Sequence, residues 1–184
     1  MSKLYLVRHG RAAAGWDVDP NPGLDELGRA QAEQASLSLS KYAPAKIVSS
    51  PLLRCQETAA PLAALLKTSV AIEQRVAEIL SPEGVELKDR VTWLRAAMTQ
   101  TWTELGQRYI SYRDDMVAFL STCTVDTVVF SHFIAINAVV GSILGDDRVL
   151  IRSFDNCSIT TIHRSDDGRL SLVDYGAEAD TLIR

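Results

Sequence analysis

The chain has 184 residues and a formal net charge of -4, with 47% hydrophobic and 23% charged residues. This length suits one compact domain, and the composition matches soluble globular proteins, which disfavours disordered and fibrous classes. A net charge of -4 gives no general attraction to nucleic acid or anionic lipid. A bound anion must therefore be held by a local group of cations.

Cysteine usage and hydropathy bear on the cellular compartment. Cys55, Cys123 and Cys157 are too few and too scattered for a disulfide framework or a zinc site, which favours a reducing cytosol. The apolar run over 4–7 is too short for a signal peptide. The stretch over 133–144 falls short of the ~20 residues that a membrane span needs. We expect a cytoplasmic protein with neither a membrane nor a nucleic-acid partner.

The first half of the chain alternates between strand and helix patterns. Residues 3–8 are apolar and β-prone, which predicts a buried strand, and a polar loop follows over 15–23. Apolar positions recur at helical spacing over 25–41, with Asp25 as N-cap. A second strand is predicted at 46–50.

The next segment leads from a helix to a region without strands. Pro51 fits the first turn of a helix that runs to about Leu66, and residues 70–72 predict a short strand. Between about 85 and 122, aromatic and apolar residues recur at steps of three and four, which predicts two helices. We interpret 85–122 as a helical insertion that covers the site, within a single domain of residues 1–184.

The last part predicts a strand at 126–131, a helix at 134–144, and a hairpin of strands at 157–163 and 169–175. The whole alternation predicts an α/β fold with a mainly parallel central sheet and helices on both faces. We treat His163, on a late strand, as structural.

Candidate site residues follow the strands of this sheet. Arg8 and His9, then Ser50, then Ser131 and His132 come at strand ends, where ligands bind in parallel sheets. Arg54 falls in the first turn of the next helix, where unpaired N–H groups and the helix dipole attract anions. Two histidines and two arginines at one edge of a sheet indicate a pocket for a phosphoryl group.

These residues belong to motifs whose order and spacing resemble those of the histidine phosphatase (phosphoglycerate-mutase-like) superfamily. The motifs are Leu6-Val7-Arg8-His9-Gly10, Leu24-Asp25-Glu26-Leu27-Gly28-Arg29-Ala30-Gln31-Ala32, Ser49-Ser50-Pro51-Leu52-Leu53-Arg54-Cys55-Gln56-Glu57-Thr58-Ala59, Glu78 and Val129-Phe130-Ser131-His132. The resemblance implies a three-layer α/β/α fold, a phosphohistidine intermediate, and neither a metal nor another cofactor.

The resemblance also implies a role for each site residue. His9 would be the nucleophile, and Arg8, Arg54 and a protonated His132 would hold the phosphoryl oxygens. The family's proton donor is either an aspartate directly after the second histidine or a glutamate on an earlier loop. Phe133 occupies the first place, so Glu78 is the expected proton donor.

Two departures from the family pattern bear on the substrate. The loop after His9 has Ala12, Ala13 and Ala14 where mutases usually carry hydrogen-bonding side chains, and Phe133 replaces the more usual glycine. We expect these residues to line the pocket mouth. The leading interpretation is a phosphatase acting on a phosphorylated small molecule or a phosphoprotein. The alternatives are a phosphoglycerate-mutase-type phosphotransferase and a catalytically silent phosphate-binding module.

Overall fold

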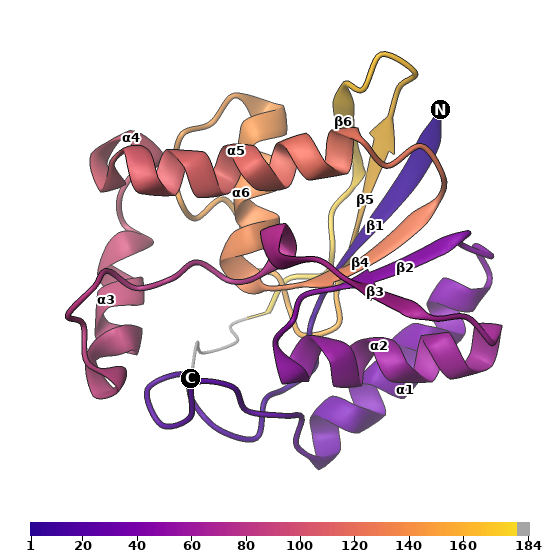
Figure 1. Cartoon of the computed structure of the whole chain (residues 1–184), viewed down its shortest axis with the longest axis horizontal. Helices are drawn as coiled ribbons and strands as arrows, with labels where there is room; N and C mark the ends of the chain where they lie inside the picture. The colour runs from indigo at the N-terminus through magenta and orange to yellow at the C-terminus, as the bar shows by residue number, and fades with distance from the viewer. Residues whose placement is uncertain (180–184) are drawn as a thin grey trace.

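A six-stranded sheet forms the centre of the protein in a computed structural model that describes residues 1–179 (Figure 1). The strand order is β3-β2-β4-β1-β5-β6. Strands β1 to β4 pair in parallel, whereas β5 runs antiparallel to β1, and β6 antiparallel to β5. The strands are β1 (Ser2–Arg8), β2 (Lys46–Ser49), β3 (Val70–Ile72), β4 (Thr127–Ser131), β5 (Ile159–Arg164) and β6 (Leu170–Asp174).

Helices cover both faces of the sheet. Figure 1 shows α1 and α2 on one face and α5 and α6 on the other, with α3 beyond the carboxyl ends of the parallel strands. The sequence-based prediction of an α/β fold with a mainly parallel sheet is confirmed. None of the helices in residues 1–179 could cross a membrane. The helices are α1 (Glu26–Ser40), α2 (Leu53–Leu66), α3 (Arg90–Ala97), α4 (Trp102–Leu105), α5 (Gln107–Ser121) and α6 (Phe133–Leu144), with 3-10 turns η1 (Gln74–Val76) and η2 (Leu87–Asp89).

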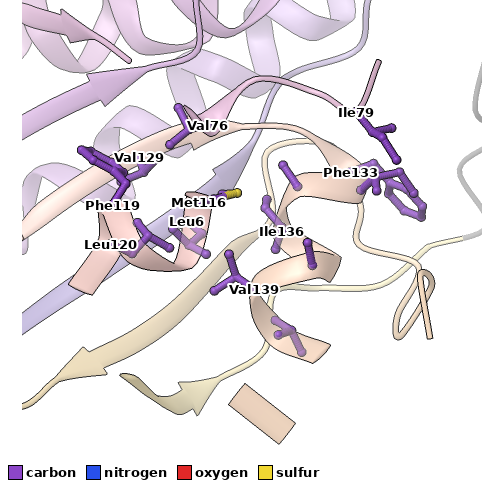
Figure 2. Close-up of a cluster of buried hydrophobic side chains, with 14 of the residues drawn as sticks. Leu6, Val76, Ile79, Met116, Phe119, Leu120, Val129, Phe133, Ile136 and Val139 are labelled. Atoms are coloured by element: carbon purple, nitrogen blue, oxygen red, sulfur yellow. The ribbon is translucent and has the colours of Figure 1, made fainter. Parts of the chain in front are cut away.

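Each face of the sheet has its own hydrophobic core, because alternate residues of a strand point to opposite faces. In β1, Leu4 and Leu6 pack in the core beneath α5 and α6, whereas Tyr5 and Val7 pack beneath α1 and α2. Figure 2 shows the first core, in which side chains from α5 and α6 meet Leu6. Burial of both faces fixes the register of β1, and with it the position of the residues that follow Arg8.

The helix boundaries differ from the prediction at two places. We expected two helices between 85 and 122, and there are three, because Gly106 adopts a φ of 93° that ends α4 before α5 begins. Pro51 lies before α2, which begins at Leu53, rather than in its first turn. Asp25 is the N-cap of α1 as expected, accepting a hydrogen bond from the Gly28 N–H.

Candidate active site

The ends of three neighbouring parallel strands bring the predicted cationic residues together. Arg8 of β1 lies beside Ser131 of β4 in the sheet register, so His9 and His132 follow neighbouring strands. The two imidazole rings lie 5.2 Å apart, centroid to centroid. Arg54, from the first turn of α2, reaches both rings: its Nε is 3.1 Å from His9 Nε2 and its Nη2 is 3.2 Å from His132 Nδ1.

Hydrogen bonds define the tautomer of His9. Its Nδ1 lies 2.8 Å from the carbonyl oxygen of Gly10, which can only accept, so Nδ1 carries the proton. Nε2 therefore carries the lone pair, which accepts a hydrogen bond from Nε of Arg54 over 3.1 Å. Burial first, and then the charges of Arg54 and Arg8, hold the pKa of His9 well below its ordinary value. The ring is neutral near pH 7, as a nucleophile must be.

The backbone around His9 is anchored on three sides. Asn156 Nδ2 donates to the His9 carbonyl over 2.9 Å, and Gly10 N–H donates to Thr58 Oγ1 over 3.0 Å. The loop also rests on the start of α1: a Cβ at Gly10 would lie 2.5 Å from the carbonyl oxygen of Gly28. Only glycine allows this approach, so Gly10 fixes where the imidazole points.

Arg54 has a hydrogen-bond donor that an anion could use. Its side chain is buried, and Nη1 has no hydrogen-bond partner among the described residues. α2 has no side-chain cap at Leu52 and no acidic residue in its first turn, so its N-terminus favours negative charge. An unpaired buried guanidinium nitrogen is costly unless a ligand satisfies it.

His132 is fully buried and lies between Arg54 and Ser50. Since Arg54 can only donate to Nδ1, the proton lies on Nε2, which donates to Ser50 Oγ over 2.8 Å. Burial first, followed by the charges of Arg54, His9 and Arg8, holds the pKa of His132 well below its ordinary value. The ring is therefore neutral in this structure, and its protonation beside a bound phosphoryl group stays a prediction. A phosphate dianion beside the ring would raise that pKa.

Arg8 is held by Phe154 and Phe133. Its Nη1 donates to the Phe154 carbonyl oxygen over 2.6 Å, and its guanidinium carbon lies 4.8 Å from the centre of the Phe133 ring. Burial lowers the pKa of Arg8 to about 10, so it stays charged at neutral pH. Phe133 is only 5% exposed and belongs to the core, so our expectation that it lines the pocket mouth is wrong.

Glu78 faces the N-terminus of α6, next to the cationic cluster. Its carboxylate accepts hydrogen bonds from the backbone N–H groups of Ile79, Ile134 and Ala135 at 3.0 to 3.3 Å. Burial raises the pKa of Glu78, and these N–H groups and the arginines oppose the rise. A carboxyl group with a raised pKa beside a cationic pocket is suited to general acid–base chemistry.

Two hydroxyl groups fix the segment that carries Glu78. Ser131 Oγ donates to the Val76 carbonyl oxygen over 2.7 Å, and Tyr112 Oη donates to that of Ala77 over 2.9 Å. β4 and α5 thus both hold the chain just before Glu78. This is how a residue from a loop keeps one position relative to His9.

A cavity of about 320 Å³ opens beside Glu78. The loop after His9 contributes Trp16 and Pro20 to its wall. The remaining lining residues come from the N-cap of α2, the segment after Glu78 and the helical region: Leu52, Ile79, Leu80, Ser81, Pro82, Glu83, Gly84, Val85, Arg90 and Arg108.

Sequence reasoning missed several residues of the site. Asn156 lies in a loop before β5 that has no motif, so no sequence signal marks it. Thr58 belongs to a quoted motif, but its contact with Gly10 depends on the packing of α2 against the His9 loop. Arg90 and Arg108 lie at helix starts, which the spacing of apolar residues over 85–122 does not mark. Within residues 1–179, no cluster of His, Cys, Asp or Glu is arranged to hold a metal ion.

The three-layer fold and the cluster of two histidines and two arginines define a phosphoglycerate-mutase-like protein. A sequence profile of the histidine phosphatase superfamily (branch 1) matches residues 4–176, and the chain belongs to this superfamily. No curated protein sequence compared with the chain matches it.

Solved structures with the same fold include several phosphatases. A structure described as mycobacterial hydrolase 1 has a TM-score of 0.75 at 23% identity, covering 96% of this chain and 99% of that one. Mycobacterial glucosyl-3-phosphoglycerate phosphatase has a TM-score of 0.72 at 25% identity, with coverage of 96% and 99%. Phosphoserine phosphatase from Entamoeba histolytica, in complex with 3-phosphoglyceric acid, has a TM-score of 0.73 at 20% identity, with coverage of 96% and 98%.

Proposed function

We propose that this protein is a metal-independent phosphatase that hydrolyses a phosphomonoester through a phosphohistidine on Nε2 of His9. The observation that carries the proposal is the His9 ring itself: its Nδ1 proton is held by Gly10, and its Nε2 lone pair faces Arg54. Membership of the superfamily and the phosphatase names of similar structures support the reaction class.

In the first step, Nε2 of neutral His9 attacks phosphorus and the bond to the leaving oxygen breaks. Arg8, Arg54 and His132 stabilise the charge that spreads over the three equatorial oxygens. Protonated Glu78 gives its proton to the leaving oxygen, so the leaving group departs as an alcohol. The products of this step are phosphohistidine and the Glu78 carboxylate.

In the second step, the Glu78 carboxylate takes a proton from a water molecule, whose oxygen attacks phosphorus. The P–N bond breaks, inorganic phosphate leaves, and His9 returns to its neutral form. The same group acts first as acid and then as base, so its pKa must lie within reach of the working pH. The raised pKa of Glu78 is consistent with this double role.

The cavity favours a small phosphorylated molecule over a phosphoprotein as substrate. Its volume of about 320 Å³ is in the usual range for small-molecule sites. We propose that the helical region of residues 85–122 covers the leaving group, because Val85, Arg90 and Arg108 line this cavity.

Trapping the intermediate tests the mechanism. Brief exposure to ³²P-labelled substrate followed by alkaline quenching should leave an acid-labile, alkali-stable label on His9, since phosphoramidates hydrolyse in acid. His9→Ala should be folded but carry no label. His163→Gln is the matched control, because His163 pairs with Lys3 at the opposite end of β1 and should label normally.

Two outcomes would contradict the proposal. Label on serine, or substantial turnover by His9→Ala, would require a different mechanism. Tight phosphate binding without turnover of any substrate would instead favour the silent binding module.

A further inference from the structure

A β-turn just before β5 lies against the end of β1, where the proposed nucleophile follows. The hydrogen bond that closes the turn runs from the Ser158 N–H to the Asp155 carbonyl oxygen, over 3.1 Å. Its two central residues are Asn156 and Cys157. Cys157 N–H donates to the Arg8 carbonyl oxygen over 3.0 Å, and Arg8 N–H donates to that of Ser158 over 3.3 Å. These two bonds continue the pairing of β1 with β5, so the backbone fixes where the turn lies.

The backbone of this turn is strained at Cys157. Its φ of 56° lies in the left-handed region, which a residue with a Cβ rarely adopts. Such a conformation persists only where its surroundings impose it, and it occurs most often at functional sites. The strained turn places the side chain of Asn156 beside the nucleophile, where Nδ2 donates to the His9 carbonyl oxygen over 2.9 Å.

Asn156 holds one end of the peptide group that joins His9 to Gly10. The carbonyl of this group accepts from Asn156, and its N–H donates to Thr58 Oγ1 over 3.0 Å. The turn before β5 and helix α2 therefore hold one planar unit at its two ends. This matters at a glycine, because glycine allows backbone rotations that other residues do not.

The orientation of this peptide group affects which nitrogen of His9 carries the proton. A neutral imidazole has one proton for two nitrogens, and the hydrogen bond at one nitrogen sets the choice. Nδ1 donates to the Gly10 carbonyl oxygen over 2.8 Å, and this carbonyl follows directly on the held peptide group. If the peptide group rotates, the Gly10 oxygen moves away from Nδ1. The tautomer with the proton on Nε2 then gains population, and it has no lone pair for attack on phosphorus.

Arg54 favours the same tautomer before substrate binds, because its Nε donates to Nε2 of His9 over 3.1 Å. In the proposed first step, however, Arg54 turns its donors to the phosphoryl oxygens, and Nε2 attacks phosphorus. At that moment only the Gly10 carbonyl holds the proton on Nδ1. The contacts that position this carbonyl therefore matter most during the reaction.

We propose that Asn156 is a positioning residue, which keeps His9 in the attacking tautomer by holding the peptide group between His9 and Gly10. Asn156 acts through these two residues and not on the substrate. The inference rests on the proposed function and adds to it a residue from a part of the chain that carries no site motif.

NMR of the ring nitrogens tests the tautomer without substrate. In protein labelled with ¹⁵N-histidine, protonated and unprotonated ring nitrogens have well-separated chemical shifts. The measurement compares Arg54→Ala with Arg54→Ala/Asn156→Leu at a pH where the His9 ring is neutral, because only Gly10 then sets the tautomer. The two His9 shifts should lie far apart in the first protein and move toward each other in the second. Spectra of His9→Ala and His163→Gln assign the signals.

Single-turnover labelling measures the effect on the reaction. In Asn156→Leu, with Arg54 present, ³²P-phosphohistidine should form about tenfold more slowly, the scale of one hydrogen bond. The affinity for inorganic phosphate should keep its native value, because Arg8, Arg54 and His132 are unchanged. Weaker phosphate binding in step with the slower labelling would indicate a general distortion of the site and overturn the positioning role.

Ser153→Ala is the matched control. Ser153 Oγ donates to the Ala179 carbonyl oxygen over 2.8 Å, so this variant also removes one side-chain hydrogen bond from the segment before β5, but outside the turn. It should leave the His9 shifts and the labelling rate at their native values. Equal changes in Ser153→Ala and Asn156→Leu would overturn the inference.

A second variant covers the case in which Asn156→Leu does not fold. Asn156→Asp keeps the shape of the side chain and accepts but cannot donate when ionised, so it should change the His9 shifts in the same way. Unchanged His9 shifts in the folded variant overturn the positioning role.

The two proposals fail separately. If substrate labels His9 in the native protein but loss of the Asn156 donor leaves the tautomer unchanged, the phosphatase stands and the positioning role falls. If the tautomer changes but no substrate labels the native protein, the contact of Asn156 controls the ring and the proposed phosphatase falls.

Discussion

Nε of Arg54 lies 3.1 Å from Nε2 of His9, the nitrogen that we propose attacks phosphorus, and Nη2 of the same side chain lies 3.2 Å from Nδ1 of His132. Arg54→Ala should lower kcat by about a hundredfold or more, because charge stabilisation of this kind is lost. Arg54→Lys should be impaired too, since one ammonium cannot span both rings. Steady-state kinetics and inhibition by vanadate measure both effects. If kcat falls by less than tenfold in Arg54→Ala, Arg54 does not stabilise the transition state.

Glu78→Gln should separate substrates by their leaving groups. An alkyl leaving oxygen needs a proton, whereas p-nitrophenolate leaves without one, so hydrolysis of alkyl phosphates should suffer far more than that of aryl phosphates. Comparison of kcat/KM for the two classes in native and variant protein measures the difference. Equal damage to both classes would assign the proton to another residue.

The pH profile of kcat/KM should have two limbs with opposite causes. The pKa of His9 is lowered, so the nucleophile becomes protonated, and activity falls, only well below pH 6.5. The pKa of Glu78 is raised, so the acid loses its proton, and activity falls, at a pH above 4.5. Profiles for an alkyl phosphate should lose the alkaline limb in Glu78→Gln. An alkaline limb that persists unchanged in this variant would belong to another group.

Thr58 joins the nucleophile loop to Arg54, because its Oγ1 accepts from Gly10 N–H and donates to the Arg54 carbonyl oxygen over 2.6 Å. Thr58→Val keeps the shape but leaves a buried N–H unpaired, which should cost about 1–3 kcal/mol of stability. Urea unfolding measures this, and kcat should fall as His9 loses its anchor. Thr58→Ser keeps the hydroxyl oxygen and should have the stability and the kcat of the native protein. If Thr58→Val is as stable and as active as the native protein, the hydrogen bond between Gly10 and Thr58 contributes to neither.

Hydrolysis should exceed mutase action. A mutase must hold a bisphosphate intermediate while it reorients, and the loop after His9 has Ala12, Ala13 and Ala14 where mutases usually carry hydrogen-bonding side chains. We expect phosphate release from 3-phosphoglycerate without isomerisation and without dependence on a bisphosphate primer. Following both products with and without primer decides this. Primer-dependent isomerisation faster than phosphate release would support the mutase alternative.

The sequence predicts the cationic cluster well because strand ends and helix starts are local features. His9 and His132 follow buried apolar strands, and Arg54 follows the next, so the parallel sheet alone places them at one edge. Asp25 could be assigned as N-cap for the same reason: its acceptor role depends only on the residues that follow it.

Contacts between residues far apart in the sequence determine the features that could not be predicted. The position of Phe133 directly after His132 suggested a pocket wall, yet the fold places its ring against Arg8 in the core. The protonation state of His132 depends on burial and on three neighbours distant in sequence. Asn156 reaches the His9 carbonyl across the sheet edge, 147 positions along the chain. Such contacts appear only once the chain is folded.

The contact between the nucleophile loop and α1 sets limits on engineering this scaffold. A Cβ at Gly28 would lie 2.1 Å from the Arg11 carbonyl oxygen, and one at Gly10 would lie 2.5 Å from that of Gly28. At these two positions the backbones of the nucleophile loop and α1 are in direct contact, with no room for a side chain. A library aimed at new substrates should therefore keep both glycines and vary 12–16 and 80–85, which line or flank the cavity. We expect a larger fraction of active variants in such a library than in one that also varies Gly10 and Gly28.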